Sequence, residues 1–61
     1  MWIKTENGNM VNLDRITNII KDKRGTVCCD SNNSEILISV MDVRPTIAVA
    51  MADGTTVLEV R

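Results

Sequence analysis

Within the first thirteen residues, two short runs with apolar side chains, W-I-K-T and M-V-N-L, lie on either side of a polar segment. Asn7-Gly8 interrupts this stretch, and the same dipeptide is favoured in two-residue hairpin turns. We therefore expect a hairpin. Pairing across a two-residue turn would bring Trp2 near Leu13 and Lys4 near Val11. One face of the hairpin should then carry Trp2, Val11 and Leu13, with the stem of Lys4 lying over it.

Three further β-prone runs follow the first hairpin. The first extends from about Arg15 to Lys21 and ends in a charged turn through Lys23, Arg24 and Gly25. The next two are Thr26–Asp30 and Glu35–Val40, and the short polar side chains of residues 31–34 between them suit a turn. These runs predict a second hairpin and an antiparallel sheet of four or five strands.

The last stretch, Thr46–Arg61, allows two interpretations. Asp53-Gly54 between apolar runs could form a two-residue turn, and the domain would then be all-β with a C-terminal hairpin. Alternatively, the spacing of Val43, Ile47 and Met51 and the alanines among them favour a helix, with Gly54 at a left-handed C-terminal cap. Propensity alone leaves both open.

Length and composition indicate a single domain, residues 1–61, with a thin core. A chain of 61 residues buries only roughly 60% of the surface that its unfolded form exposes. Chains of this size usually need disulfides, a metal, very regular packing or self-association for stability. There is no His, the two Cys are adjacent, and Trp2 is the one aromatic residue. We therefore expect no metal and no cofactor, and we expect a homo-oligomer.

Charge narrows the classes of partner. Seven basic and eight acidic side chains give a net charge of -1, so the overall field would not attract nucleic acid or an anionic membrane. No apolar span of membrane-crossing length occurs, and the N-terminus becomes polar too early for a signal peptide. A cytoplasmic location with reduced thiols is the expectation.

Both ends of the chain resemble a known group of proteins. The opening M-W-I-K-T-E-N-G-N-M-V-N-L-D-R-I is similar to that of small, largely uncharacterised proteins of Gram-positive bacteria and their phages, which begin M-W-I-(R/K). The end I-A-V-A-M-A-D-G-T-T-V-L-E-V resembles their close, a helix that runs into a short final strand. The resemblance implies a β-rich α+β domain with one short helix over residues 43–52 and a last strand over residues 56–60. It carries over no binding residues.

The only basic cluster consists of Lys21, Lys23 and Arg24, which could contact a small anion such as a nucleotide together with Arg44. A solvated turn that protects a sheet edge from aggregation explains the same cluster without any ligand. Trp2 could stack on a base, or it could fill a thin core or a dimer seam.

Catalysis has no support in the sequence, and we expect no enzyme. There is no His, no G-x-S-x-G and no Gly-rich phosphate loop. Neighbouring residues of a strand point to opposite faces, so one thiol of Cys28-Cys29 should be buried and the other should lie at the surface.

Three functions remain, and the third is that of a structural or regulatory oligomer without a ligand. The first is a non-enzymatic oligomeric binding module, an accessory protein of a phage or mobile element that binds a host protein; the phage setting comes from the resemblance alone. The second is a small-molecule binder that sequesters a nucleotide-like anion and so inhibits a host defence signal.

Overall fold

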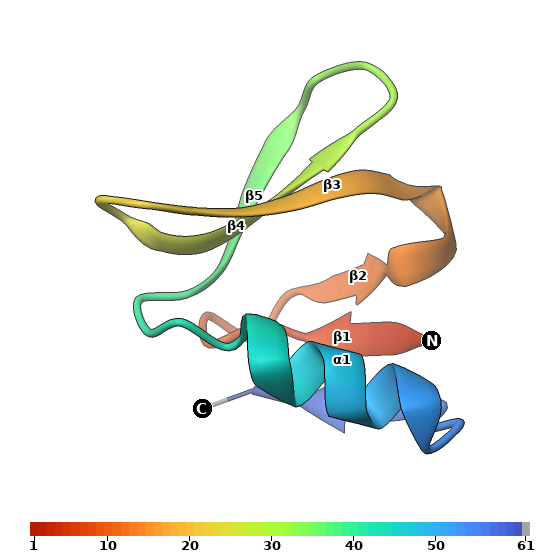
Figure 1. Cartoon of the computed structure of the whole chain (residues 1–61). Coiled ribbons are helices and arrows are strands. Elements are labelled where there is room, and N and C mark those ends of the chain that lie inside the picture. Colours follow the sequence, from red (N-terminus) through yellow and green to blue (C-terminus); the bar gives the residue numbers. More distant parts are fainter. Residues whose placement is uncertain (61) are drawn as a thin grey trace.

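Two three-stranded sheets and one helix form the small α+β domain described by a computed structural model of residues 1–60 (Figure 1). The chain order is β1 (Trp2–Lys4), β2 (Met10–Asn12), a 3-10 helix η1 (Leu13–Arg15), β3 (Ile16–Asp22), β4 (Gly25–Asp30), β5 (Glu35–Ser39), α1 (Arg44–Ala52) and β6 (Val57–Glu59).

The strands do not form the single antiparallel sheet of four or five strands that the sequence predicted. The first sheet has the order β2-β1-β6 and the second has the order β3-β4-β5. Strand β6 is parallel to β1, whereas every other pair is antiparallel. A parallel pair needs a long crossover connection, and the chain makes this connection through the second sheet and α1 before it returns to β1.

The first hairpin is confirmed, but its predicted register is wrong by one residue. Trp2 lies opposite Asn12 and Lys4 lies opposite Met10. The Gly8 N–H donates to the Thr5 carbonyl, and the Thr5 N–H donates to the Asn9 carbonyl. The loop therefore has three residues and not two. This one-residue change reverses which side chains share a face, so Trp2 lies on the opposite face from the buried Val11.

The second sheet agrees with the predicted runs. Strands β3 and β4 join at a turn ahead of Gly25, and β4 and β5 join through residues 31–34. At the second turn the Asp30 carboxylate accepts hydrogen bonds from the N–H groups of Asn32 and Ser34, both at 2.9 Å. Asn33 adopts a left-handed conformation with φ 62°. Short polar side chains stabilise turns in this way.

The last stretch forms a helix and not a hairpin. Pro45 lies in the first turn of α1, and the Asp42 carboxylate accepts a hydrogen bond from the Arg44 N–H. At the other end the N–H groups of Gly54 and Thr55 donate to the carbonyls of Met51 and Ala50, and Gly54 has φ +71°. This bonding is a Schellman cap, which requires a left-handed residue that glycine provides at little cost. Gly54 thus ends a helix and does not turn a hairpin.

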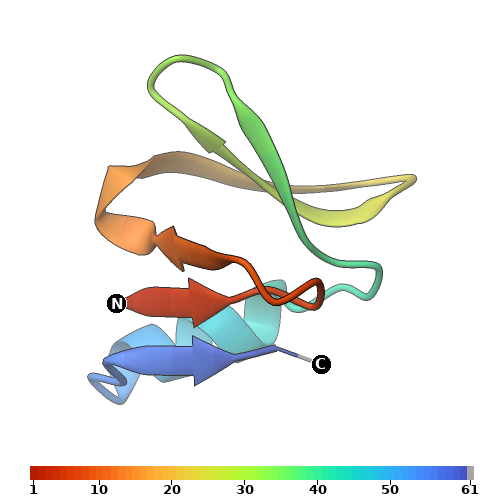
Figure 2. The same ribbon diagram turned by 180° about the vertical axis from the view of Figure 1, so that it is seen from behind.

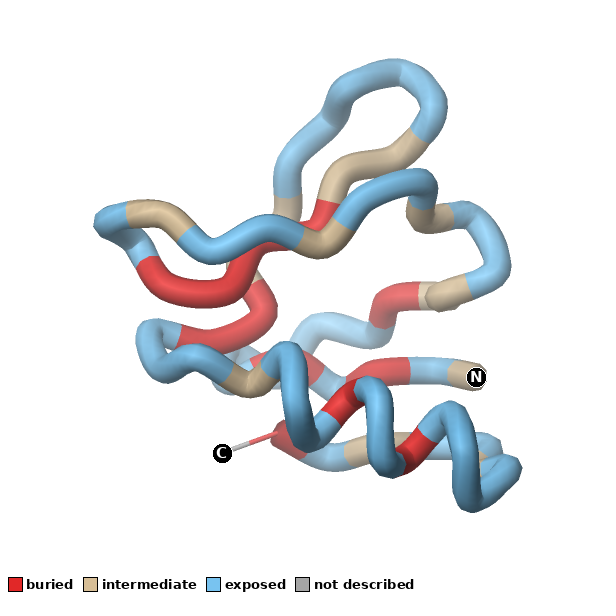
Figure 3. The backbone as a smooth tube through the Cα atoms, in the orientation of Figure 1, coloured by how far each residue is buried: buried red, intermediate tan, exposed pale blue. Residues whose placement is uncertain are grey.

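The core lies where the helix and both sheets meet. It draws on β1, β2, β4, β5, α1 and the residue after β6, and its members are Ile3, Val11, Cys28, Ile38, Ile47 and Val60. Figure 3 shows these buried segments facing inward while the ends of the long hairpins are exposed. Figure 2 shows that α1 covers one face of the β2-β1-β6 sheet and leaves the other face bare.

Candidate functional site

The structure brings three of the predicted cations together but separates them from Trp2. Lys21 is the second-last residue of β3, which ends at Asp22, and Lys23 and Arg24 form the turn that follows the strand. Lys21 also lies within electrostatic range of Asp42, the residue that binds Arg44. Trp2 begins β1, whose N-terminal end lies at the opposite side of the molecule from the β3–β4 turn (Figure 1).

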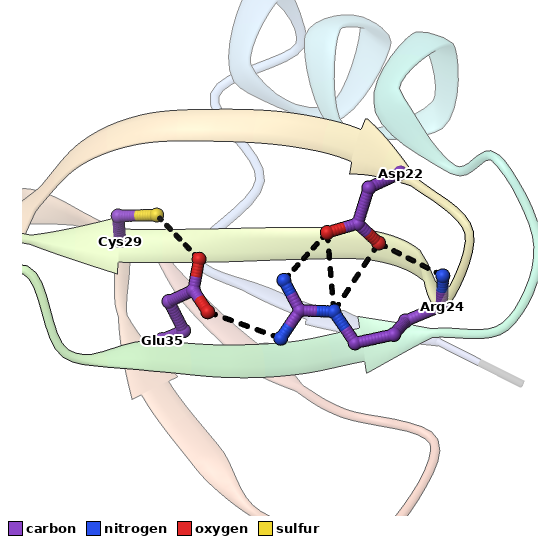
Figure 4. Close-up of polar contacts among 4 residues, drawn as sticks. All are labelled: Asp22, Arg24, Cys29 and Glu35. Carbon is purple, nitrogen blue, oxygen red and sulfur yellow. Dashed lines mark hydrogen bonds and ion pairs between the residues drawn. The ribbon is translucent and has the colours of Figure 1, made fainter.

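Arg24 is bound by two carboxylates of its own sheet (Figure 4). Its Nε lies 3.1 Å from Asp22 Oδ2, and its Nη1 lies 3.0 Å from Glu35 Oε1. Hydrogen bonding to the guanidinium lowers the pKa of Asp22, and the bonds to Asp22 and Glu35 raise the pKa of Arg24. The guanidinium therefore joins the end of β3 at Asp22 to the start of β5 at Glu35.

Arg44 is bound in a similar manner. Its Nε and Nη2 lie 2.8 Å from the two carboxylate oxygens of Asp42. Hydrogen bonding to this guanidinium lowers the pKa of Asp42 to about 2. Both arginines of the predicted anion site thus have carboxylate partners within the chain, so an incoming phosphate would have to displace them.

The uncovered face of the β2-β1-β6 sheet, which we call the outer face, carries an exposed apolar group. Trp2 has 45% of its surface exposed, Met10 50% and Val57 54%. The sheet register places Trp2 beside Val57 and Lys4 beside Met10. Three strands thus contribute one apolar side chain each to the outer face, which also carries Lys4 between Met10 and Glu59.

A second exposed apolar surface lies between α1 and β6, and we call it the β6 groove. Its volume is about 460 Å³. The helix contributes Pro45, Thr46, Val49 and Ala50, and the segment after it contributes Asp53, Thr55 and Leu58. No residue of β1 or β2 lines it among residues 1–60, so the groove lies on the side of β6 that faces away from β1.

The other side of α1 borders a groove near the chain's N-terminus. Two hollows of about 560 and 300 Å³ meet there and share Leu13 and Met51. The Met1 amino group lies 3.7 Å from the exposed carboxylate of Asp14 at its rim. A single ion pair at an exposed carboxylate contributes little binding energy, so this groove offers shape but no strong polar recognition.

The cysteines lie on opposite sides of β4, as expected for neighbouring residues in a strand. Cys28 is buried in the core, Cys29 is half-buried, and both thiols are free. Burial raises the pKa of Cys28. The Cys29 Sγ lies 4.0 Å from Glu35 Oε2 (Figure 4).

Most residues of these surfaces were not predicted from the sequence, among them Met10, Val49, Val57 and Leu58. Alternation within β6 already implied that Val57 and Leu58 face opposite ways, but only the sheet order shows which face is covered. Met10 was not predicted to share a face with Trp2, because the predicted hairpin register was wrong. Val49 is two positions after Ile47, and residues two positions apart lie about 200° apart around a helix. The sequence could therefore have indicated that Val49 lies on the other side of the helix from Ile47.

Within residues 1–60, no helix is long and apolar enough to cross a membrane. The same residues contain no cluster of three or more metal-binding side chains. No family model matches the chain, and neither a curated protein nor a solved structure resembles it significantly.

Proposed function

We propose that this protein is a non-enzymatic binding module whose outer face binds another protein. The observation that supports the proposal most strongly is the exposure of Trp2, Met10 and Val57 on the outer face, which α1 does not cover. Contiguous exposed apolar side chains are typical of protein interaction sites. Tryptophan is enriched among the residues that contribute most to binding energy at such sites.

The composition of the outer face defines the kind of partner. Its second row carries Lys4 between Met10 and Glu59, so it combines apolar contacts with charges of both signs. A protein surface with an apolar centre and a mixed polar border is complementary to this arrangement. A polyanion such as nucleic acid would instead need a surface rich in cations.

The biological setting is proposed from the resemblance alone. Similarity of the chain's ends to small proteins of Gram-positive bacteria and their phages suggests an accessory protein of a phage or mobile element. Its partner would then be a host protein in the bacterial cytoplasm.

A matched pair of double variants tests the outer face. M10S/V57S removes two of its apolar side chains, whereas V40S/M41S makes the same substitutions at exposed positions in the β5–α1 connection. The replaced side chains are similarly exposed, at 50% and 54% in the first variant and at 64% and 61% in the second. Circular dichroism should show that both variants fold.

A tagged chain should retain a partner from a Gram-positive lysate, and the same partner, once purified, should bind the tagged chain directly. Wild type and V40S/M41S should bind it alike, and M10S/V57S should bind it at least about tenfold more weakly, which corresponds to roughly 1.4 kcal/mol. Equal binding by both double variants would contradict the proposal.

A nucleotide-like anion is the second candidate ligand, and it is favoured by the gathering of Lys21, Lys23 and Arg24 at one hairpin end. It would bind there by displacing the carboxylates from Arg24 and Arg44. A panel of mono-, di- and cyclic nucleotides should leave the melting temperature unchanged if the first proposal is right. A reproducible rise that is abolished in K21A/K23A would favour the second.

A further inference from the structure

Strand β6 lies at the edge of its sheet, and the β6 groove lies beside it under an exposed stripe of α1. We propose that a second copy of this chain binds here. The two β6 strands pair antiparallel about a two-fold axis, and the two α1 helices pack side by side over the joined six-stranded sheet. This inference goes beyond the proposed function and uses a different surface.

The backbone of β6 presents hydrogen-bonding groups away from its sheet. The Trp2 N–H donates to the Thr56 carbonyl at 2.8 Å, and the Val60 N–H donates to the Lys4 carbonyl at 2.9 Å. Backbone groups alternate in direction along a strand, so the N–H and C=O of Val57 point to the open side. A second strand is a natural partner for such an edge.

The β6 groove lies beside this unpaired strand edge and is lined on its other side by α1. Leu58 of β6 lines the groove together with Pro45 and Val49, which are four residues apart and share one side of the helix. Val49 has 60% of its surface exposed. An added strand beside β6, with a helix above it, would cover this stripe and fill the groove.

The spacing of the elements fits a second copy. Helix α1 lies over β1 and β6 (Figures 1 and 2), and neighbouring strands are about 4.8 Å apart. Two-fold pairing of β6 therefore places the two helices roughly two strand spacings apart, or about 10 Å. Packed helices have axes about 8 to 10 Å apart, so Val49 and Pro45 of both copies can meet over the seam.

The charges at the ends of α1 also suit an antiparallel copy. Asp53 caps the C-terminal end, where the helix dipole makes a carboxylate unfavourable, and Arg44 begins the helix, where a cation is unfavourable. Arg44 has Asp42 as a partner, whereas Asp53 lines the β6 groove. A two-fold axis would bring Asp53 beside the positive N-terminal end of the second copy's helix.

The same features favour a second copy over an extended peptide of another protein. A peptide could pair with the strand edge, but it would bring no helix to cover Val49 and no positive helix end for Asp53. In the two-fold arrangement one surface supplies the strand, the apolar stripe and the complementary charge, as an isologous interface requires.

Sedimentation equilibrium of the full chain tests the proposal, with two helix variants as a matched pair. Val49 and Met51 are exposed to a similar extent, 60% and 58%, but they face different sides of α1. V49K would place two like charges near the two-fold axis. The dissociation constant of the dimer should therefore be at least about tenfold higher in V49K than in wild type. M51K should dimerise as wild type does.

A monomeric wild-type chain at several hundred micromolar would overturn the proposal, as would equal weakening by V49K and M51K. Hydrogen exchange provides a second readout. The Val57 amide should gain protection as the protein is concentrated, and the gain should be absent in V49K. M10S/V57S keeps the β6 backbone and should still dimerise, so loss of partner binding and loss of dimerisation can be told apart.

Discussion

Thr26 connects the β3-β4-β5 sheet to the start of α1, and its removal provides the sharpest test of how the small fold is held together. Its side chain is fully buried, and its hydroxyl donates to the Met41 carbonyl at 2.7 Å and accepts from the Val43 N–H at 3.0 Å. Val43 is the N-cap of α1 and provides no side-chain cap of its own. The Thr26 hydroxyl therefore satisfies backbone groups that the helix start would otherwise leave without a partner.

The variant T26V keeps the side chain's shape and deletes only the hydroxyl. It leaves one donor and one acceptor unsatisfied, at about 1 to 3 kcal/mol each for groups out of contact with water. Because both groups are partly buried, we expect a loss of about 2 to 4 kcal/mol. A chain of 61 residues has roughly 3 to 9 kcal/mol of stability in total, so T26V should lie near the limit of folding.

Urea denaturation followed by circular dichroism measures the loss, and T26S is the control. Serine keeps the hydroxyl and removes one methyl group, so T26S should lose only about 1 kcal/mol. The reasoning would be refuted if T26V lost less than about 0.5 kcal/mol, or if both variants were destabilised equally.

Three further predictions concern a glycine, a carboxylate and the thiols. In G25A the new methyl group would overlap the backbone at the end of β5, and residue 25 has φ +123°. Thermal melting should therefore show a loss of stability of at least ~2 kcal/mol. The control G8A adds a methyl group in open space and should lose less stability. The pKa of Asp42 is lowered from 3.8 to about 2, so its ion pair stabilises the fold above pH 4 and ceases to do so as the pH falls toward 2. Acid titration of D42N should accordingly show a smaller loss of stability over that window, and an unchanged profile would contradict the pairing. A thiol reagent should modify Cys29 well before Cys28, whose burial shields it; simultaneous reaction would mean that β4 opens readily.

The sequence predicted the elements better than their arrangement. Local signals were sufficient for the turn at residues 31–34. The helix, whose observed bounds are Arg44–Ala52, was preferred to a hairpin only because of the resemblance. Asp53-Gly54 was ambiguous because the same dipeptide suits a hairpin turn and a left-handed cap. The two cap hydrogen bonds of Gly54 and Thr55 decide the matter, and they exist only once the preceding helix has formed.

The sheet arrangement could not be read from local patterns. Pairing of β6 with β1 joins residues at the two ends of the chain, and alternation within a strand does not specify its neighbour. The register error at the first hairpin had a larger effect on the candidate site. A loop of three residues, where two were expected, moved Trp2 to the exposed face and brought Met10 beside Lys4.

The positions of the predicted site residues were predicted with unequal success. The cations were correctly placed at a turn and at a helix start, but the sequence could not show that Asp22 and Asp42 bind Arg24 and Arg44 across one intervening residue. Of the three roles considered for Trp2, only the filling of the core is wrong, because Trp2 is 45% exposed. Exposure of a large apolar side chain depends on what covers it, and coverage is decided by tertiary structure.

The central claim is that the outer face binds a protein partner, and Trp2 reports on that face directly because it is the sole aromatic residue of the chain. The most direct measurement is quenching of Trp2 fluorescence by acrylamide, with and without the purified partner. The partner used must contain no tryptophan, or its tryptophan must be replaced. In the free protein Trp2 is 45% exposed, so quenching should be efficient. The account predicts that the partner shields Trp2 and shifts its emission to shorter wavelength. Undiminished quenching in a saturated complex would contradict it.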